Sequence, residues 1–371
     1  MLRPLIVGLG RSGAGLHLAA LKKLRTPSGT ARDAEEAPLF HWPPLAWDPR
    51  PTAASGLDDV TALASLAEAA RRTPPEETVV HLCTPPAARA GVLGRLAGLG
   101  YTRVLVEKPL ACDPDQLQSV TRLRDEYRLD VAVVAHWLAA GLTQRLRDLI
   151  ADRGLGRLLS VEVAQHKPRF DRTLATHGHP TAFDVEIPHS LGVVLDLAGA
   201  AELETAHCTD MHCGTTVVPH MGSAALTLRH AGGVRTDIVS DLTSPVQQRS
   251  VTLRFTEGTA TAHYPISERD DHAQLILSGA VPAHDTFRDE ALSPFLRRTY
   301  QRYAQGPADD FALHHAVARL LCQAKAHCRA GEEPPADPAP PTRADAPLTV
   351  DPAPPTRADA PLTVEGDARA R

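Results

Sequence analysis

The feature that most constrains the fold is a glycine-rich turn near the start of the chain. Residues 5–7, Leu-Ile-Val, lead directly into residues 8–13, Gly-Leu-Gly-Arg-Ser-Gly, and an amphipathic stretch follows over residues 16–24. In such a strand, turn and helix, the first glycine permits the tight turn, the second lets a pyrophosphate approach the backbone, and the third lets helix and strand pack closely. Phosphates bind at the helix N-terminus, where free N–H groups point. The sequence therefore predicts a dinucleotide site that includes Gly8, Gly10, Arg11, Ser12 and Gly13.

The next predicted strand, residues 45–47, ends at a carboxylate. It follows a polar, proline-bearing insert over residues 26–44, and Asp48 comes directly after it. A carboxylate at the end of the second strand hydrogen-bonds the adenine ribose hydroxyls and repels a 2′-phosphate, which favours NAD. Arg50 could instead accept the 2′-phosphate of NADP, and Asp48 could simply open a turn with Pro49. The expected cofactor is NAD or NADP, with NAD slightly favoured.

A third strand ends in a proline-rich loop. The pattern predicts a helix over residues 60–72, a strand over residues 78–83 and a helix over residues 87–99. Thr84-Pro85-Pro86 lies between that strand and the second helix, and its prolines end the strand and stiffen the loop. We expect this loop to lie at the nicotinamide end of the dinucleotide.

A fourth apolar strand, residues 104–106, ends abruptly at Glu107-Lys108-Pro109. Its composition is typical of a buried parallel strand, and Pro109 ends it because proline has no N–H to donate. Ligands bind at the carboxyl ends of strands in doubly wound sheets, so Lys108 should face the crevice. The chain has five lysines against thirty-four arginines, and a lysine, unlike an arginine, can give up its proton. The alternative is that Glu107 and Lys108 merely solvate a strand end.

The glycine turn, Thr-Pro-Pro and Glu-Lys-Pro, in this order, resemble the Gfo/Idh/MocA family of NAD(P)-dependent oxidoreductases, which is named after glucose-fructose oxidoreductase and inositol dehydrogenase. The resemblance covers the first 110 residues. It implies a Rossmann domain, an α/β doubly wound parallel sheet, followed by an α+β domain with a large, mostly antiparallel open sheet and an active site between them. It also implies that Lys108 contacts the nicotinamide ribose and the oxygen on the reacting carbon, and that its peptide bond to Pro109 is often cis.

The chain beyond residue 110 fits the same plan. Helices are predicted over residues 114–127 and 143–151, and strands over residues 131–135 and 158–164. His136 and Trp137 follow the first of these strands, where relatives in the family often place substrate-facing residues. Lys167 and Arg169 follow the second. These two cations could bind a phosphate or carboxylate of the substrate, or they could pair with acids elsewhere in the chain.

Many members of the family carry an Asp-x-x-x-His motif that binds substrate hydroxyls and moves the proton. His189 matches its histidine, but Val185 stands where the aspartate would be. Pro188 favours a helix that begins at this proline, with Asp184 and Glu186 in a preceding extended segment. Either acid is a candidate for the missing carboxylate, and a nearby carboxylate would fix the tautomer of His189. The predicted catalytic residues are Lys108, His189, Glu186 and Asp184, although His189 could also have a purely structural role.

From residue 224 to residue 277 apolar residues alternate with polar ones, and glycine-containing turns separate the runs. This pattern predicts antiparallel strands, most with one solvated face. A large open sheet commonly buries its exposed face in a partner, so a homodimer or homotetramer is expected. Helices over residues 294–303 and 308–328 complete the predicted fold.

Composition narrows the possible partners. The net charge of −5 provides no basic field for nucleic acid or an anionic membrane. Nothing in the sequence resembles a transmembrane span, and no signal-peptide pattern precedes the first strand. A cytoplasmic location is therefore expected. The six cysteines are scattered, which favours reduced thiols. The pairs at residues 207–208 and 212–213, both His-Cys, lack the spacing of a metal site, and no metal is expected.

The last stretch of the chain is a repeat. Residues 337–350 read DPAPPTRADAPLTV, and residues 351–364 repeat them letter for letter. A segment rich in proline and charge cannot bury a core, so it is interpreted as a disordered tail without a catalytic role. The predicted division is 1–128 for the dinucleotide-binding domain, 129–330 for a substrate-binding and oligomerisation domain, and 331–371 for the tail.

The predicted function is hydride transfer between nicotinamide and a small polyhydroxylated substrate: a sugar, amino sugar or cyclitol. Two alternatives stay open. The same site could catalyse a redox-neutral epimerisation or the reduction of an imine, which the missing aspartate makes more credible. The second alternative is a non-catalytic regulator that senses a dinucleotide. The presence of Lys108 argues against this alternative, because a sensor has less need of a proton-active group.

Overall fold

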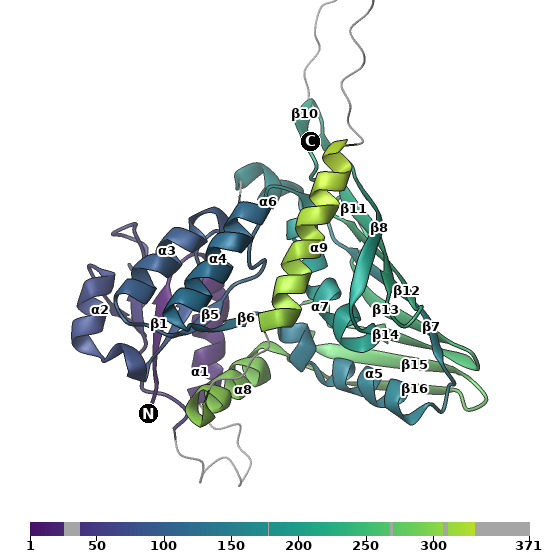
Figure 1. The fold of residues 1–371 in the computed structure, drawn as a ribbon, viewed down its shortest axis with the longest axis horizontal. Helices are drawn as coiled ribbons and strands as arrows, with labels where there is room; N and C mark the ends of the chain where they lie inside the picture. Colours follow the sequence, from purple (N-terminus) through teal and green to yellow (C-terminus); the bar gives the residue numbers. More distant parts are fainter. Residues whose placement is uncertain (26–37, 177, 268–269, 307–310, 331–371) are drawn as a thin grey trace, which may run out of the picture. The chain divides into compact units, whose positions relative to one another are not determined.

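The structure, a computed structural model, describes residues 1–25, 38–176, 178–267, 270–306 and 311–330. Its contacts group Met1–Glu332 as one unit and Glu333–Arg371 as another. The repeat and residues 26–37 of the insert lie outside the described residues. The first unit contains two sheets and the helices packed on them (Figure 1).

The first sheet has six parallel strands in the order β3-β2-β1-β4-β5-β6. The strands are β1 (Arg3–Val7), β2 (Leu45–Trp47), β3 (Thr61–Ala62), β4 (Thr78–Leu82), β5 (Arg103–Val106) and β6 (Asp130–Val133). This is the strand order of a doubly wound Rossmann sheet, and it reverses between β1 and β4. The predicted fold class of this part is therefore confirmed.

Each face of this sheet has its own core. Side chains of a strand alternate between faces, so Leu5 and Val7 pack into one core and Ile6 into the other. Helices α3 (Pro86–Gly98) and α4 (Pro114–Tyr127) cover the first face. The second face is covered by α1 (Ala19–Arg25), which continues the π-helical segment η1 (Arg11–Leu18), and by α8 (Leu292–Gln305), from near the end of the chain.

The prediction of a helix over residues 60–72 is wrong in its first half. Thr61–Ala62 form the short edge strand β3, which pairs with β2, and α2 spans Leu66–Arg72. The Ser65 hydroxyl accepts a hydrogen bond from the Glu68 N–H at 3.1 Å and so caps α2 at its N-terminus. The predicted start ignored this cap. A short 3-10 helix, η2 (Pro75–Glu77), then leads into β4.

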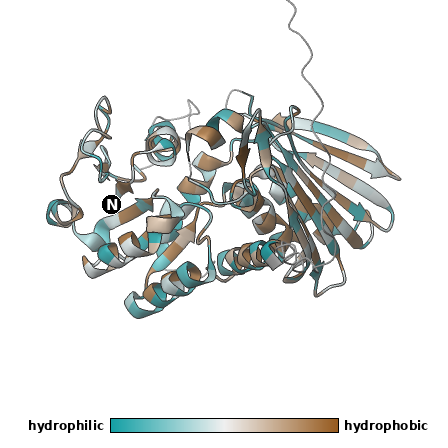
Figure 2. Cartoon of the chain, turned by 90° about the horizontal axis from the view of Figure 1, so that it is seen from above, coloured by the Kyte–Doolittle hydropathy of each residue, from teal (hydrophilic) through white to brown (hydrophobic). Residues whose placement is uncertain are grey.

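The second sheet has eight strands in the order β16-β15-β14-β13-β7-β12-β11-β8. All neighbours are antiparallel except β7 and β12, so the predicted mostly antiparallel sheet is confirmed. Apolar and polar positions alternate along its strands (Figure 2). The strands are β7 (Leu158–His166), β8 (Ala201–Cys208), β11 (Ser223–His230), β12 (Arg235–Asp241), β13 (Gln248–Phe255), β14 (Gly258–His263), β15 (His272–Gly279) and β16 (Ala283–Arg288).

Helices α5 (Gly141–Asp152), α7 (Ile187–Ala198) and α9 (Phe311–Ala330) contribute to the core of the second sheet. Helix α9 contacts β8 and α7 and also α4 and β6, so it joins the two sheets (Figure 1). Shorter elements complete this part: η3 (His136–Ala139), α6 (Phe170–Ala175), η4 (Ala182–Asp184) and the hairpin of β9 (Met211–Cys213) with β10 (Thr216–Val218).

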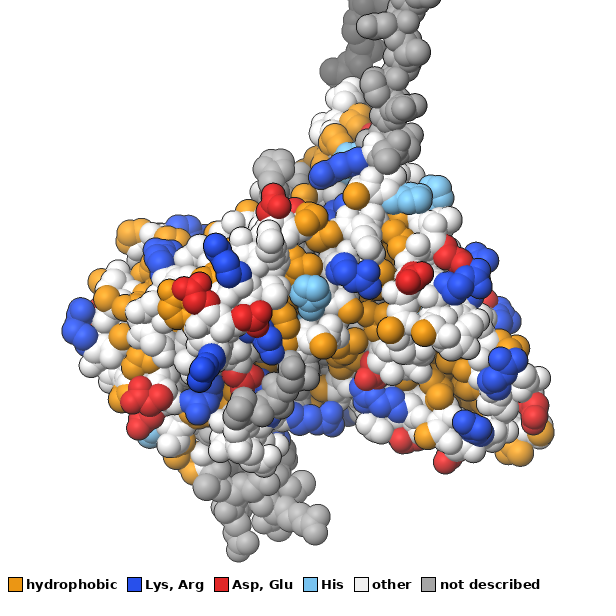
Figure 3. Space-filling view, viewed as in Figure 1, with side chains coloured by type: hydrophobic (Ala, Val, Ile, Leu, Met, Phe, Trp, Pro, Cys, Tyr) orange, Lys and Arg blue, Asp and Glu red, His pale blue; other side chains and the backbone are white. Residues whose placement is uncertain are grey.

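The division at residues 128 and 129 stays a prediction. Strand β6 follows that division in the chain but completes the parallel sheet by pairing with β5. Charged side chains of both signs are scattered over the face of the molecule in Figure 3, without a continuous patch of one sign there. Within the described residues, no helix is long and apolar enough to cross a membrane.

Candidate active site

The glycine turn is shaped by close backbone packing. Gly8 has φ +98°, and a Cβ there would lie 3.0 Å from the Cys83 carbonyl oxygen. A Cβ on Gly13 would lie 1.9 Å from the Gly8 carbonyl oxygen, so both positions require glycine. A Cβ on Gly10, by contrast, would meet no described atom within 4 Å. Gly10 therefore leaves open space beside the backbone, as the approach of a pyrophosphate needs.

Asp48 and Arg50 form a pair at the end of β2. The Asp48 carboxylate accepts hydrogen bonds from the Leu9 N–H at 2.7 Å and from Nε and Nη2 of Arg50, both at 2.9 Å. The Arg50 side chain is the first cause that lowers the pKa of Asp48 to about 2. The Asp48 side chain is 5% exposed and the Arg50 side chain 65% exposed. Arg50 thus neutralises the carboxylate that was expected to repel a 2′-phosphate.

One cavity of about 1400 Å³ runs from the glycine turn to the second sheet. Most of the predicted site residues line it: Gly8, Gly10, Arg11, Ser12, Asp48, Arg50, Thr84, Pro85, Pro86, Glu107, Lys108, His136, Trp137, Lys167, Arg169, Glu186 and His189. Gly13, Pro109 and Asp184 are not among its lining residues. The structure therefore brings most of the predicted cofactor-binding residues and all four predicted substrate-binding residues, His136, Trp137, Lys167 and Arg169, to one cavity.

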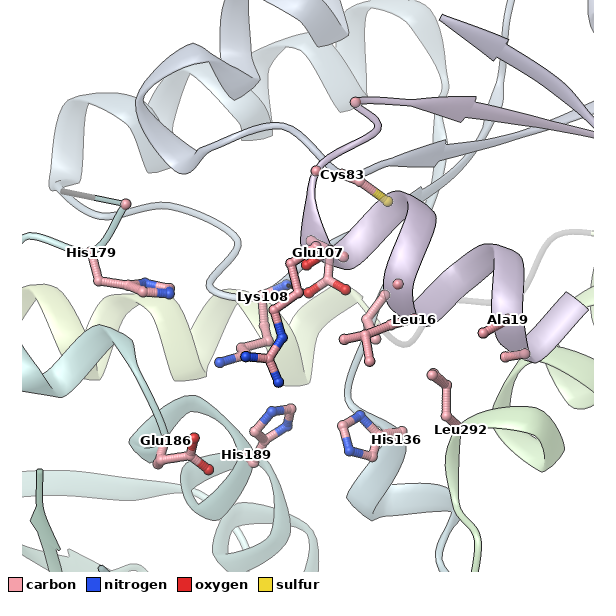
Figure 4. Close-up of a pocket in the computed structure, with 18 of the residues that line it drawn as sticks. Leu16, Ala19, Cys83, Glu107, Lys108, His136, His179, Glu186, His189 and Leu292 are labelled. Atoms are coloured by element: carbon pink, nitrogen blue, oxygen red, sulfur yellow. Dashed lines mark hydrogen bonds between the residues drawn. The ribbon is translucent and has the colours of Figure 1, made fainter. Parts of the chain in front are cut away.

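Lys108 lines the cavity between Glu107 on one side and His189 on the other (Figure 4). The peptide bond between Lys108 and Pro109 is cis. Nζ of Lys108 donates a hydrogen bond to the carbonyl oxygen of Val185, in the segment before α7. Burial lowers the pKa of Lys108, and the carboxylates of Glu186 and Glu107 act against this shift. An ammonium in this setting gives up its proton more readily than one in water.

Behind Lys108, a chain of buried hydrogen bonds holds Glu107. Nε2 of His17 lies 2.9 Å from Oε1 of Glu107, and Nδ1 of His17 lies 2.7 Å from Nδ1 of His81. Nε2 of His81 lies 2.8 Å from the Tyr300 hydroxyl. Burial acts to lower the pKa of His17, but the side chains of Cys83 and Glu107 raise it to about 10. With His17 protonated, it donates to both Glu107 and His81, and the carboxylate beside Lys108 stays ionised.

Aromatic rings form the opposite wall of the cavity. Trp137 stacks on Tyr264, with ring centroids 4.3 Å apart and an interplanar angle of 6°. It also stacks with His189 at 5.6 Å, and His136 meets His189 edge-on at 4.7 Å. The Tyr264 hydroxyl lies 2.6 Å from the Thr143 hydroxyl, which donates to the Trp137 carbonyl. This stack fixes the orientation of the His189 ring.

Both histidines of this wall are neutral at physiological pH. Burial is the first cause that lowers the pKa of His136 to about 4, and it lowers the pKa of His189 well below its ordinary value. Nδ1 of each ring is buried and has no hydrogen-bond partner among the described residues. Figure 4 shows both rings close to Lys108, across the cavity from Glu107. Two buried ring nitrogens beside the cavity thus lack a hydrogen-bond partner within the described residues.

Glu186 lines the cavity but does not pair with His189. Its carboxylate accepts from Nζ of Lys167, and its Oε2 lies 3.9 Å from Nη2 of Arg249. Burial acts to raise the pKa of Glu186, but Lys167, Lys108 and Arg249 lower it to about 2. In the described part of the chain, no carboxylate accepts a hydrogen bond from the His189 ring. The predicted carboxylate that would fix its tautomer is therefore not found there.

Asp184 has a different environment from the one expected. It lies in the 3-10 helix η4 rather than in an extended segment, and it is fully buried. Its Oδ2 accepts from the Thr181 hydroxyl at 2.8 Å, and its Oδ1 accepts from Nζ of Lys325 on α9 at 2.7 Å. Both oxygens are thus held by the protein itself. Asp184 supports the loop that carries Val185 and Glu186 instead of facing the cavity.

Several lining residues were missed by the sequence reasoning. The cavity is also lined by Arg172 and His179, which follow β7, by Arg249 and Tyr264 of the second sheet, and by Cys83. Arg172 lies three residues beyond Arg169 and continues the run of cations at the end of β7. That run was a usable signal for Arg172. Arg249 and Tyr264 reach the cavity through sheet pairing between distant segments, which the sequence does not show.

The fold resembles solved structures at low sequence identity. A protein from Desulfitobacterium hafniense, provisionally assigned as an NADPH-dependent oxidoreductase, is 14% identical, with a TM-score of 0.72 over 89% of this chain and 96% of that chain. A 3-ketoreductase from Actinomadura kijaniata, solved with NADP and TDP-benzene, is 14% identical, with a TM-score of 0.69 over 89% and 97%. UDP-N-acetylglucosamine 3-dehydrogenase from Acidithiobacillus ferrooxidans is 18% identical, with a TM-score of 0.66 over 89% and 98%.

The sequence matches no protein-family model and no curated protein. At identities of 14% to 18% the structural likeness establishes the fold.

Proposed function

We propose that this chain is an NAD(P)-dependent oxidoreductase that interconverts an alcohol and a ketone on a sugar, amino sugar or cyclitol. One observation carries the proposal: the cavity that begins at the open backbone of Gly10 ends at Lys108 and the unpartnered rings of His136 and His189. A dinucleotide site and a proton-active site thus share one space. The solved structures of similar fold include a 3-ketoreductase with NADP and TDP-benzene bound and a UDP-N-acetylglucosamine 3-dehydrogenase, which supports the same reaction class.

The residues fit a nicotinamide dinucleotide. Gly8, Gly10, Arg11 and Ser12 line the phosphate end, and Asp48 and Arg50 line the adenosine end. Because Arg50 neutralises Asp48 and exposes its guanidinium, we propose that the site accepts NADP as well as NAD. When bound, the dinucleotide supplies the hydride donor or acceptor.

The protein groups would handle the proton. Lys108, with its lowered pKa, is positioned to donate a proton to a carbonyl oxygen or to hold the oxygen of an alcohol. Neutral His189 offers an unpartnered ring nitrogen for a substrate hydroxyl. Glu107 and Glu186 stay ionised and keep an ammonium at Lys108 favourable despite its burial. Trp137 provides an apolar wall of the kind on which sugar rings pack.

A turnover assay with variants of Lys108 tests this proposal. The protein is incubated with NAD or NADP and a panel of free and nucleoside-diphosphate sugars, and reduced nicotinamide is followed by absorbance. Lys108→Met should keep dinucleotide binding while turnover falls by roughly two to four orders of magnitude, the usual effect of losing a positioned acid or base.

Lys108→Arg is the sharper variant, because arginine keeps the charge but holds its proton at every working pH. We expect it to be almost as inactive as Lys108→Met. Near-normal turnover of the arginine variant would show that charge alone is needed, and the proton-transfer role of Lys108 would then have to be withdrawn.

A further inference from the structure

Arg169 is a buried cation with no carboxylate within 4.0 Å among the residues that the structure describes. It lines the cavity, it is 7% exposed, and its Nε has no hydrogen-bond partner within the described residues. Its backbone is fixed, because its N–H donates to the Leu242 carbonyl at 2.9 Å and its carbonyl accepts from the Thr173 N–H at 2.9 Å. With this backbone, the side chain is buried at the cavity rather than extended into solvent.

The nearby acid is already occupied. Glu186 is bound by Lys167, and Arg249 lies beside it, so two cations share its charge before Arg169 is counted. In the described ranges, neither Arg169 nor Arg172 has a carboxylate within 4.0 Å. Burial and the charge of Arg172 lower the pKa of Arg169 to about 10. The charge of Arg11 also acts to lower the pKa of Arg169 and that of Arg172. Cations outnumber anions on this side of the cavity.

A buried charge without a partner is costly unless a ligand supplies the opposite charge. The planar fork of a guanidinium matches the paired oxygens of a phosphate or a carboxylate. We propose that Arg169 and Arg172 bind an oxyanion, a phosphate ester or carboxylate, carried by the substrate. This inference rests on the proposed function and narrows its substrate class to anionic derivatives of polyhydroxylated compounds.

The position of these arginines favours the substrate over the cofactor as the source of the oxyanion. Arg169 follows β7 of the second sheet and lies two residues after Lys167, whose partner Glu186 acts on the pKa of Lys108. The phosphates of a dinucleotide have their own partners in the glycine turn, including Arg11. A substrate that spans Lys108 and Arg169 would be held at its reacting carbon and at its anionic group together, so a neutral sugar should bind poorly.

Calorimetric titration of pyrophosphate into the NADPH-saturated protein tests the inference. Saturation with NADPH keeps the probe out of the cofactor site. Pyrophosphate should bind the wild type, and Arg169→Gln and Arg172→Gln should each weaken it by roughly 10-fold to 100-fold, the range for charged hydrogen bonds. The matched control is Arg157→Gln, because Arg157 is exposed and precedes β7 at its opposite end. That change should alter binding by no more than about twofold.

The affinity of each variant for NADPH shows whether the arginines bind an oxyanion of the substrate or one of the cofactor. We expect it to stay within about threefold of wild type for Arg169→Gln, because an arginine that does not touch the dinucleotide affects it only through screened charge. An equal loss of NADPH and pyrophosphate binding would assign these arginines to the cofactor and overturn the inference, as would a wild type that takes up no pyrophosphate.

If Arg169→Gln fails to fold, Arg172→Gln decides, because Arg172 is only half-buried. A protein that binds pyrophosphate through Arg169 but binds neither NADPH nor NADH would contradict the proposed function and leave the oxyanion site in place.

Discussion

Lys108 owes its chemistry to residues on both sheets. Glu107 precedes it at the end of β5, and Val185, whose carbonyl accepts its hydrogen bond, precedes α7. The sequence allowed the position of Lys108 to be predicted because a strand that ends in proline, in a doubly wound sheet, must end at the ligand-binding edge. Its contact with Val185 could not be predicted, because Val185 lies 77 positions further along the chain and only the folded structure brings the two residues together.

The acids beside His189 show the limit of motif reading at the same scale. Asp184 and Glu186 were equal candidates by position, and the structure separates them: Glu186 lines the cavity and Asp184 does not. Asp184 is held away from the cavity by one local contact and one contact that is distant in the sequence. Thr181 and Asp184 form a capping box, and Lys325, 141 residues away, binds the remaining oxygen. The Thr-x-x-Asp spacing was visible in the sequence, but its lysine partner was not.

Protonation of His17 should make stability depend on pH. The Cys83 and Glu107 side chains outweigh burial and raise the pKa of His17 in the folded protein to about 10, above its ordinary value of 6.5. Its stabilising contribution is therefore complete below pH 6.5 and is lost as pH rises toward 10. Between these values the folded state binds more protons than the unfolded state, so the free energy of unfolding should fall with pH, by at most about 1.4 kcal/mol per pH unit.

Urea unfolding between pH 6.5 and pH 7 measures this slope in a window where Lys167 contributes little, since the pKa of Lys167 is lowered from 10.5 to about 8. The lowered lysine pKa has the opposite effect, because stability then rises with pH above 8. His17→Gln should remove the decline seen in the wild type. Equal slopes for wild type and His17→Gln would show that His17 is neutral in the folded protein.

Helix α9 acts at the scale of elements. Nζ of Lys325 donates to the Cys112 carbonyl at 2.5 Å, in the loop that follows Glu107-Lys108-Pro109, and to Asp184 at 2.7 Å, in the segment before α7. The lysine side chain is 6% exposed and the aspartate side chain 0%. One buried ammonium on α9 therefore ties together the two segments that meet at Lys108.

Loss of that ammonium should destabilise the fold strongly. Lys325→Met leaves Asp184 buried and unpaired, and we expect the free energy of unfolding to fall by about 3–5 kcal/mol. Lys22→Met is the matched control, because Lys22 pairs with Asp59 at the surface with both side chains nearly half exposed, and its loss should cost about 0–1 kcal/mol.

The double variant Asp184→Asn/Lys325→Met provides a second comparison by urea unfolding. Removing both charges should lower the free energy of unfolding by less than the sum of the two single changes, because no unpaired charge is then left in the core. Additive losses would mean that the two side chains do not interact, and α9 would lose its role as the tie between these segments.

Element prediction was accurate where apolar periodicity was strong. Helix α4 spans Pro114–Tyr127, the range expected from the sequence, and five of the six parallel strands fall within a residue or two of their predicted positions. The exception is β3, where a helix was predicted. Strands β8 and β12 were not predicted. Burial alternates irregularly along β8 but regularly along β12, and each strand carries charged residues, such as Glu202 in β8 and Asp237 in β12. They are stabilised by pairing with β11 and β7, which is information outside their own sequence.

At the scale of the whole molecule, the first unit places two sheets around one cavity. Three short motifs sufficed to predict the first sheet, because each marks the carboxyl end of a parallel strand and those ends meet at one edge. The second sheet was predicted from the alternation of apolar and polar residues over residues 224–277. The contents of the opposite wall were less accessible. Trp137 was expected there, but Tyr264 and Arg249 reach it through pairings of the second sheet.

The central claim is that a nicotinamide dinucleotide lies against Gly10, and titration of Gly10→Ala with NADPH and NADH tests it most directly. Gly10 has φ −76° and a Cβ there meets no described atom within 4 Å, so alanine should leave the melting temperature nearly unchanged. A methyl group in the path of the pyrophosphate should nevertheless weaken binding of both dinucleotides by roughly 10-fold or more, as for a lost charged hydrogen bond. Wild-type affinity in Gly10→Ala, or a wild type that binds neither dinucleotide, would contradict the account.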